Sequence, residues 1–160
     1  MKITFISNYL NHHQLPLCKE LSKLTNDNFR FVACEEINPD RISLGYSDMN
    51  QHPFVIRVYE SEEKLREAVK WCMKSDVIIH GGAEEKFAKI RIEAGRPVFR
   101  YSERLFKTGM IRALSPRAIK NICKNHTKYR KNTVYMLCAS AFTAKDFAIY
   151  GAYKNKAYRW

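Results

Sequence analysis

Acidic residues are absent from one long stretch of this sequence. Residues 104–145 contain no aspartate and no glutamate, although the whole chain of 160 residues has 16 acidic side chains. The same stretch holds ten basic residues, which account for most of the net charge of +12: Arg104, Lys107, Arg112, Arg117, Lys120, Lys124, Lys128, Arg130, Lys131 and Lys145. A field of one sign predicts an anionic partner, namely nucleic acid, an anionic lipid surface or a phosphorylated ligand. The alternative is a solvated basic face without a partner.

The sequence also lacks the patterns of a disulfide-bonded, zinc-binding or membrane-spanning protein. Its five cysteines are odd in number and form no CxxC pair, which argues against a disulfide framework and a zinc site. Cys34, Cys72 and Cys138 lie in apolar surroundings, where a reduced thiol acts as a small hydrophobic group. No apolar run approaches the ~18 residues of a membrane span, and residues 1–7 are too short for a signal peptide core. We therefore predict a reduced, cytoplasmic protein.

Several nucleotide-binding and nucleic-acid-binding motifs are missing as well. Neither GxGxxG nor GxxxxGK[ST] occurs, so the sequence carries no dinucleotide fingerprint and no P-loop. It has no DxD motif, and it shows no RRM, KH or zinc-finger signature. We expect no cofactor and no metal ion, and nucleic acid is the less favoured partner.

Short apolar strands alternate with helical segments along the chain. Strands are predicted at residues 2–7, 29–34, 54–59, 76–80, 97–101 and 134–139, and residues 36–51 are predicted as a loop. Helices are predicted at residues 16–24, from 62 onward, at 83–94 and at 116–128, and a capping-box pattern of Thr143 and Asp146 starts a last short one. This order predicts one α/β domain: a Rossmann-like, doubly wound, mainly parallel sheet of about six strands in a three-layer αβα arrangement.

Three polar turns follow predicted strands, at residues 8–14, 80–82 and 102–104. Ligands of open parallel sheets bind beyond the carboxyl ends of the strands, and this topology would bring the three turns to one rim. The candidate substrate-binding residues of these turns are Asn8, Asn11, Gln14, His80, Gly81, Gly82 and Ser102.

Three titratable side chains in these turns are candidate catalytic residues. His12 and His13 can act as a general base near neutral pH, and the alternative is that they cap or pack at the start of a helix. Glu103 lies between Arg100 and Arg104, which favour its ionised form, so it can orient a sugar hydroxyl or accept a proton. A structural ion pair is the alternative for Glu103. Plain packing is the alternative for His80, and a simple tight turn for Gly81-Gly82.

Basic and apolar residues are interleaved after Glu103. Apolar residues such as Leu105 and Ile111 alternate with cations, and further cations recur at three- and four-residue spacing on the next predicted helix. This combination suits contact with an anionic membrane surface. The candidate anion-contact residues are Lys107, Arg112, Arg117, Lys120 and Lys124. An amphipathic helix with solvated lysines is the alternative.

Five segments cover most of the chain and carry a resemblance to a known family. They are "MKITFISNYLNHHQLPLCKEL", "SDVIIHGG", "FRYSERLFKTGMIRALSPR", "NHTKYRKNTVYMLCASAF" and "GAYKNKAYRW". The chain resembles the N-terminal domain of a bacterial glycosyltransferase of GT-B architecture, in the retaining group that builds capsular and cell-surface polysaccharides. The blocks "YSERLFK" and "NHTKYR" are the more specific ones.

The resemblance implies two facing Rossmann-like domains, of which residues 1–160 are the acceptor-binding one. The donor-binding C-terminal domain is absent from this chain, so we expect the chain alone not to catalyse transfer. The whole protein would move a hexose from a nucleotide-sugar to a saccharide or lipid-linked acceptor, without a metal ion, at the cytoplasmic membrane face. Residues 11–13 and 81–82 would line the cleft, with Glu103 close to the reacting sugar. Many relatives have a glycine-rich loop in place of "NYLNHHQ", which favours an acceptor role for this loop over phosphate contact.

A function of a different class remains open. The basic charge also suits a non-catalytic, flavodoxin-like module that binds nucleic acid or another phosphorylated ligand. Steep salt dependence of oligonucleotide binding would favour the module, and binding to anionic vesicles without affinity for oligonucleotides would favour the transferase.

Overall fold

A computed structural model describes residues 1–107 and 109–160, apart from the side chains of Met110 and Arg112. The chain packs as two units, residues 1–87 and residues 88–160. The boundary falls within helix α4 (Glu85–Glu93).

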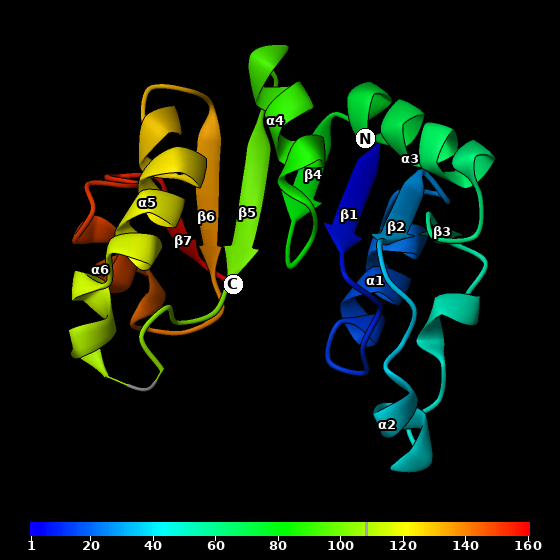
Figure 1. Ribbon diagram of the computed structural model, residues 1–160. Coiled ribbons are helices and arrows are strands. Elements are labelled where there is room, and N and C mark those ends of the chain that lie inside the picture. The colour runs from blue at the N-terminus through cyan, green and yellow to red at the C-terminus, as the bar shows by residue number, and fades with distance from the viewer. Residues whose placement is uncertain (108) are drawn as a thin grey trace. The chain divides into compact units, whose positions relative to one another are not determined.

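The first unit contains a four-stranded parallel sheet (Figure 1). Its elements are β1 (Ile3–Ser7), α1 (Leu15–Leu24), β2 (Phe29–Ala33), α2 (Pro39–Ser43), the 3-10 helix η1 (Met49–Gln51), β3 (Val55–Arg57), α3 (Glu62–Lys74) and β4 (Val77–His80). The strand order is β3-β2-β1-β4, and every pair is parallel. All five residues of the central strand β1 are buried, as expected for a strand that is covered on both faces.

The handedness of the crossovers explains this coverage. The connection through α1 leads from β1 to β2, and the connection through α3 leads back across the sheet from β3 to β4. Because such crossovers are right-handed, opposite directions place α1 and α3 on opposite faces of the sheet. The first unit is therefore doubly wound and has three layers.

The second unit contains three parallel strands in the order β5-β6-β7. After α4 its elements are β5 (Val98–Ser102), the 3-10 helix η2 (Met110–Leu114), α5 (Pro116–Asn125), the 3-10 helix η3 (Thr127–Tyr129), β6 (Val134–Cys138), α6 (Thr143–Ala148) and β7 (Ala157–Arg159). Burial alternates along β5 and β6, so one face is packed and the other carries half-exposed aromatic rings. On that face the ring of Tyr135 lies 4.9 Å from Phe99 and 6.1 Å from Tyr158.

The predicted α/β, Rossmann-like fold is confirmed, with four differences in detail. The described residues form seven strands and not about six, because residues 157–159 pair with β6. Residues 36–51 are more than a loop, since they contain α2 and η1. Helix α5 ends at Asn125, and η3 follows it. The predicted capping box is wrong, because Phe142 is the N-cap residue of α6 and Asp146 is buried within the helix, where it bonds other backbone amides.

All five cysteines are free thiols. Cys18, Cys72 and Cys138 are buried, Cys34 is half-buried and Cys123 is exposed. Burial raises the pKa of Cys18 to about 12 and that of Cys34 to about 11. At neutral pH these thiols therefore stay protonated and act as small apolar groups. None of the helices formed by the described residues is long and apolar enough to span a bilayer.

Among the described residues, Cys123 is the one cysteine with an exposed side chain, so we expect its thiol to react fastest. The thiolate is the nucleophile, and at pH 8 a pKa of about 12 leaves roughly 10⁻⁴ of Cys18 in that form. We expect a disulfide reagent such as DTNB to modify one thiol of the folded protein rapidly and all five in denaturant. Cys123→Ser should remove the rapid phase. Two or more rapid thiols in the folded protein would contradict this assignment.

Candidate functional site

The loop after β1 is held in shape by its own side chains. Asn11 Oδ1 accepts hydrogen bonds from the backbone amides of His13 and Gln14, both at 3.1 Å, and so organises the start of α1. The rings of His12 and His13 lie 3.7 Å apart between centroids. His13 is exposed and His12 half-buried, so both imidazoles are accessible from solvent. The side-chain oxygen of Asn11 therefore stabilises the loop, while the imidazole rings of His12 and His13 remain open to solvent.

The turn after β4 meets the loop after β1. Gly81 N donates to Ile6 O at 2.8 Å, and a Cβ on Gly81 would lie 3.1 Å from Ser7 Oγ. A Cβ on Gly82 would lie 4.0 Å from Asn8 Oδ1 and meet nothing closer. The close approach of the two backbones explains why glycine stands at position 81. Two of the three predicted turns therefore lie side by side at the carboxyl edge of the first sheet.

His80 is placed differently from its neighbours in this turn. Its side chain is buried, and Nε2 lies 3.1 Å from the carbonyl oxygen of Glu84. This placement favours the packing alternative for His80 over contact with a ligand.

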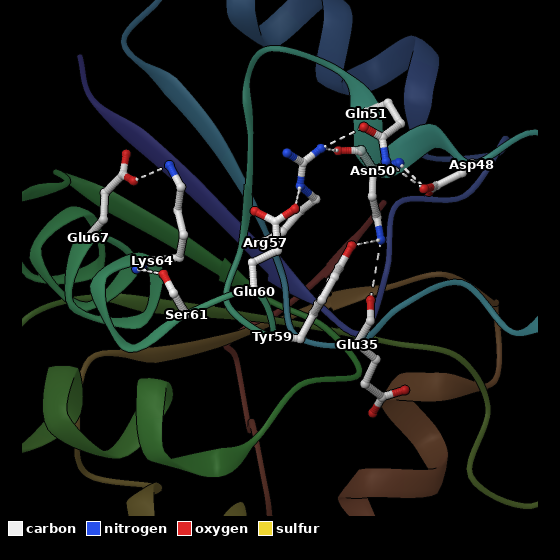
Figure 2. Close-up of polar contacts among 10 residues, drawn as sticks. All are labelled: Glu35, Asp48, Asn50, Gln51, Arg57, Tyr59, Glu60, Ser61, Lys64 and Glu67. Carbon is white, nitrogen blue, oxygen red and sulfur yellow. Dashed lines mark hydrogen bonds and ion pairs between the residues drawn. The ribbon is translucent and has the colours of Figure 1, made fainter.

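Asn50 bonds to three loops at once, and we call its side chain the hub of the candidate site. No pattern in the sequence singled this residue out. Its side chain is fully buried, with Oδ1 accepting from Leu10 N at 2.9 Å and Nδ2 donating to Glu35 O and to the hydroxyl of Tyr59. Figure 2 shows how this side chain joins segments that follow β2 and β3. One amide thus connects the loops after β1, β2 and β3. Burial also raises the pKa of Tyr59, which keeps the phenol protonated.

An outer ring of polar contacts supports the hub (Figure 2). Arg57 Nη1 donates to Gln51 Oε1 at 2.8 Å, and Arg57 Nε lies 2.6 Å from Glu60. Asp48 accepts from Asn50 N and Gln51 Nε2, both at 2.9 Å. These bonds link η1 to the end of β3, and the two that involve the Gln51 side chain are exposed, so that water can replace them.

A small hollow opens beside His12. Its lining includes Tyr9, His12, Arg41 and Tyr46 and has no acidic residue among the described ones. The guanidinium carbon of Arg41 lies 5.6 Å from the ring centroid of Tyr9 and 5.9 Å from that of Tyr46. The ring of His12 lies 5.4 Å from that of Tyr46. The hollow has a volume of about 10 Å³, the space of roughly one water molecule, and the rings of Tyr9 and Tyr46 in its wall lie against Arg41.

The third predicted turn belongs to the second unit. Ser102 Oγ donates to the carbonyl oxygen of Glu103 at 2.9 Å, and the exposed carboxylate of Glu103 forms an ion pair with Lys107. The structural ion pair predicted as the alternative role of Glu103 is thus present, with Lys107 as the partner. That residues 102–104 join the other two turns at one rim stays a prediction.

Asp146 fixes the segment after β5. Its buried carboxylate accepts from the amides of Leu105 and Phe106 at 3.0 and 3.3 Å and lies 3.4 Å from Arg104 Nε. The guanidinium of Arg104 also stacks over Phe142, 4.7 Å from the ring centroid. The sequence held one signal for this role, because Asp146 is the sole acidic residue of residues 104–160.

The candidate anion-contact residues have different surroundings. Arg117, Lys120 and Lys124 are exposed on α5, whereas Lys107 is paired with Glu103. The side chain of Arg112 lies outside the described residues. Among the residues that the structure describes, no three His, Cys, Asp or Glu side chains gather closely enough to hold a metal ion.

The chain is similar in fold to several solved structures. Structures with the same Rossmann-like arrangement match 99% of this chain, and the chain spans less than half of their length. One is Anabaena Alr3699/HepE in complex with UDP, at 16% identity, a TM-score of 0.59 and 43% of that chain. HepE in complex with UDP-glucose gives 15% identity and a TM-score of 0.57. UDP-N-acetylglucosamine 2-epimerase from Rickettsia bellii gives 12% identity, a TM-score of 0.56 and 44% of that chain.

At these identities the likeness establishes the fold. No family model matches the sequence, and no curated protein matches it.

The two adjacent glycines form a matched pair for mutation. Gly81→Ala would force a methyl group to within 3.1 Å of the buried Ser7 Oγ, while the methyl group of Gly82→Ala would make only an ordinary contact with Asn8 Oδ1 at 4.0 Å. We expect Gly81→Ala to lower the free energy of unfolding by about 1 kcal/mol and Gly82→Ala to leave it within about 0.5 kcal/mol of wild type. Denaturant unfolding measures both. Equal effects of the two changes would show that the two turns are not in close contact.

Asn50 is fully buried and its neighbour Gln51 is exposed. Alanine variants of the two residues therefore separate the effect of the buried bonds of Asn50 from that of any other change in η1. Asn50→Ala leaves the amide of Leu10 without its partner, so we expect a loss of about 2 kcal/mol in the free energy of unfolding. Gln51 is exposed, and Gln51→Ala should cost less than about 0.5 kcal/mol. Hydrogen exchange of the Leu10 amide should accelerate only in the Asn50 variant. An unchanged exchange rate of the Leu10 amide in Asn50→Ala would show that Asn50 does not hold the loop after β1.

Proposed function

We propose that this chain is the acceptor-side half of a GT-B glycosyltransferase that moves a sugar from a nucleotide-sugar to a saccharide or lipid-linked acceptor in cell-surface polysaccharide synthesis. The observation that carries the proposal is that the polar loop after β1, in which His12 and His13 are accessible from solvent, meets the Gly81-Gly82 turn at the carboxyl end of β1. That end of a parallel sheet is where ligands bind. The fold adds support, since the similar structures include one bound to UDP-glucose and one named as a UDP-sugar epimerase.

A second feature of the loop suits a hydroxyl-rich ligand. Gln14 is only 8% exposed, and its Oε1 has no hydrogen-bond partner among the described residues. A buried acceptor without a donor is unfavourable, and a water molecule or a hydroxyl group of an acceptor would satisfy it. The amide nitrogen of Asn11 is a donor that the loop itself does not use, since Asn11 bonds through its oxygen.

The chemistry assigned to the loop is general base catalysis. An acceptor hydroxyl attacks the anomeric carbon of the donor sugar, the nucleoside diphosphate leaves, and a base takes the hydroxyl proton. His12 is the candidate nearest to the hollow, since its ring is part of the lining, and His13 lies beside it. Glu103, held by Lys107, would orient a hydroxyl of the reacting sugar. The donor would bind mainly to a part of the protein outside this chain, without a metal ion or cofactor, and the protein would work in the cytoplasm.

The test uses the full-length protein that contains this chain. If one of the three side chains acts as acid or base, replacing it with alanine should slow sugar transfer by about 100-fold or more. The variants are His12→Ala, His13→Ala and Glu103→Ala, with His52→Ala and Glu63→Ala as controls outside the candidate site. Transfer is measured as labelled sugar that passes from a nucleotide-sugar to acceptor glycan.

Two outcomes would count against the proposal. Wild-type rates in all three variants would remove the catalytic assignment. A wild-type protein that converts a UDP-sugar to its epimer without any acceptor would place the chain in an epimerase, as one of the similar structures is.

A further inference from the structure

Helix α5 presents a stripe of cations without ion-pair partners. Arg117, Lys120 and Lys124 recur at three- and four-residue spacing, so they share one face of the helix. All three are exposed, and none has an ion-pair partner among the described residues. Some lysines of the first unit are paired with nearby acids, as in Lys23 with Glu20 and Lys64 with Glu67. The charge on α5 therefore has no ion-pair compensation from the residues that the structure describes.

Two large, exposed aliphatic side chains precede this stripe in the chain. Ile111 and Leu114 of η2 are 81% and 76% exposed, directly before α5 in the chain. Their segment is anchored, because Ala113 and Phe106 are buried and the hydroxyl of Tyr150 donates to Ala113 O at 2.6 Å. The two aliphatic groups are thus presented to solvent by a fixed piece of backbone.

The spacing of the cations matches a surface better than a single phosphate. Arg117 and Lys124 are seven residues apart, which corresponds to ~10 Å along a helix. One phosphate group cannot contact charges spread over that length, whereas the headgroups of a bilayer can. A nucleic acid would supply phosphates at such spacings but would leave Ile111 and Leu114 in water. A lipid surface accommodates both the charges and the aliphatic groups.

We propose that η2 and α5 form a docking surface for an anionic lipid bilayer, in which Ile111 and Leu114 enter the interface and Arg117, Lys120 and Lys124 contact lipid phosphates. We call these five residues the η2–α5 surface. The inference does not depend on the function proposed above, because it uses neither the hollow nor the histidines.

Vesicle sedimentation with the chain itself tests the proposal. We expect binding to vesicles of phosphatidylcholine and phosphatidylglycerol (3:1) and none to phosphatidylcholine alone. Neutralising Arg117, Lys120 and Lys124 to Gln together should lower the partition coefficient roughly 100-fold, at about fivefold for each cation near a membrane surface. Ile111→Ser with Leu114→Ser should lower it by at least about tenfold. This double serine variant, the serine pair, should also lose the vesicle binding that persists in high salt, because salt screens the charges but not the apolar contact.

The first unit offers matched controls. Lys19, Lys70 and Lys74 are exposed cations without ion-pair partners among the described residues, so their change to Gln removes the same net charge from elsewhere. Leu24 and Leu44 are 79% and 76% exposed, and their change to Ser removes the same kind of apolar surface. Neither control should lower binding by more than about threefold, and all variants should unfold at the wild-type temperature since the side chains are exposed.

Three results would overturn the proposal. Loss of binding in the lysine control equal to that in the α5 variant would show that net charge alone is responsible. Unchanged binding in the serine pair, with competition by millimolar inorganic phosphate at constant ionic strength, would show a site for free phosphate. Tight oligonucleotide binding that depends on α5 but not on Ile111 or Leu114, without vesicle binding, would show a nucleic-acid module.

Discussion

The loops of this protein are held by buried polar side chains that come from far along the sequence. Asn50 accepts from the amide of Leu10, 40 residues away, and Asp146 accepts from that of Leu105, 41 residues away. Each fixes the segment that follows a parallel strand, β1 in the first unit and β5 in the second. Because a buried amide without a partner is costly, each segment has one favoured conformation for as long as its anchor is present.

This constraint determines what the candidate site can do. In the first unit, the fixed backbone at Leu10 sets where Tyr9 and His12 stand relative to Arg41. Side chains that are already in position can bind a ligand without the free-energy cost of ordering a loose loop at the moment of binding. In the second unit, the carboxylate of Asp146 forms an ion pair with Arg104, and the carboxylate of Glu103 forms one with Lys107. The sequence suggested that Arg100 and Arg104 would flank Glu103, so the anchor changes the partner of the candidate catalytic carboxylate.

The sequence predicted features that depend on local pattern and left out those that depend on distant contacts. Strand β4 comes from a continuous apolar run and β1 from an alternating one, and Pro16 and Pro116 mark the first turns of α1 and α5 as predicted. Strand β7 was missed because its three residues pair with β6 without an apolar pattern of their own. Asn50 was missed because an asparagine in a polar segment looks the same whether solvent or three backbone segments surround it. Its role follows from contacts that no sequence window contains.

The arrangement of charge on α5 is unfavourable for the helix itself. Helices α1 and α3 include opposite charges three residues apart, as in Glu20 with Lys23 and Lys64 with Glu67, although α3 also has Arg66, Lys70 and Lys74 at four-residue spacing. Helix α5 places like charges at those spacings, and each such pair costs a few tenths of a kcal/mol. The stability of α5 must then come from its buried side, where Ile122 packs into the core. The cations on the other side add little to the stability of α5, apart from Lys124, which lies in the last turn where the helix dipole favours positive charge.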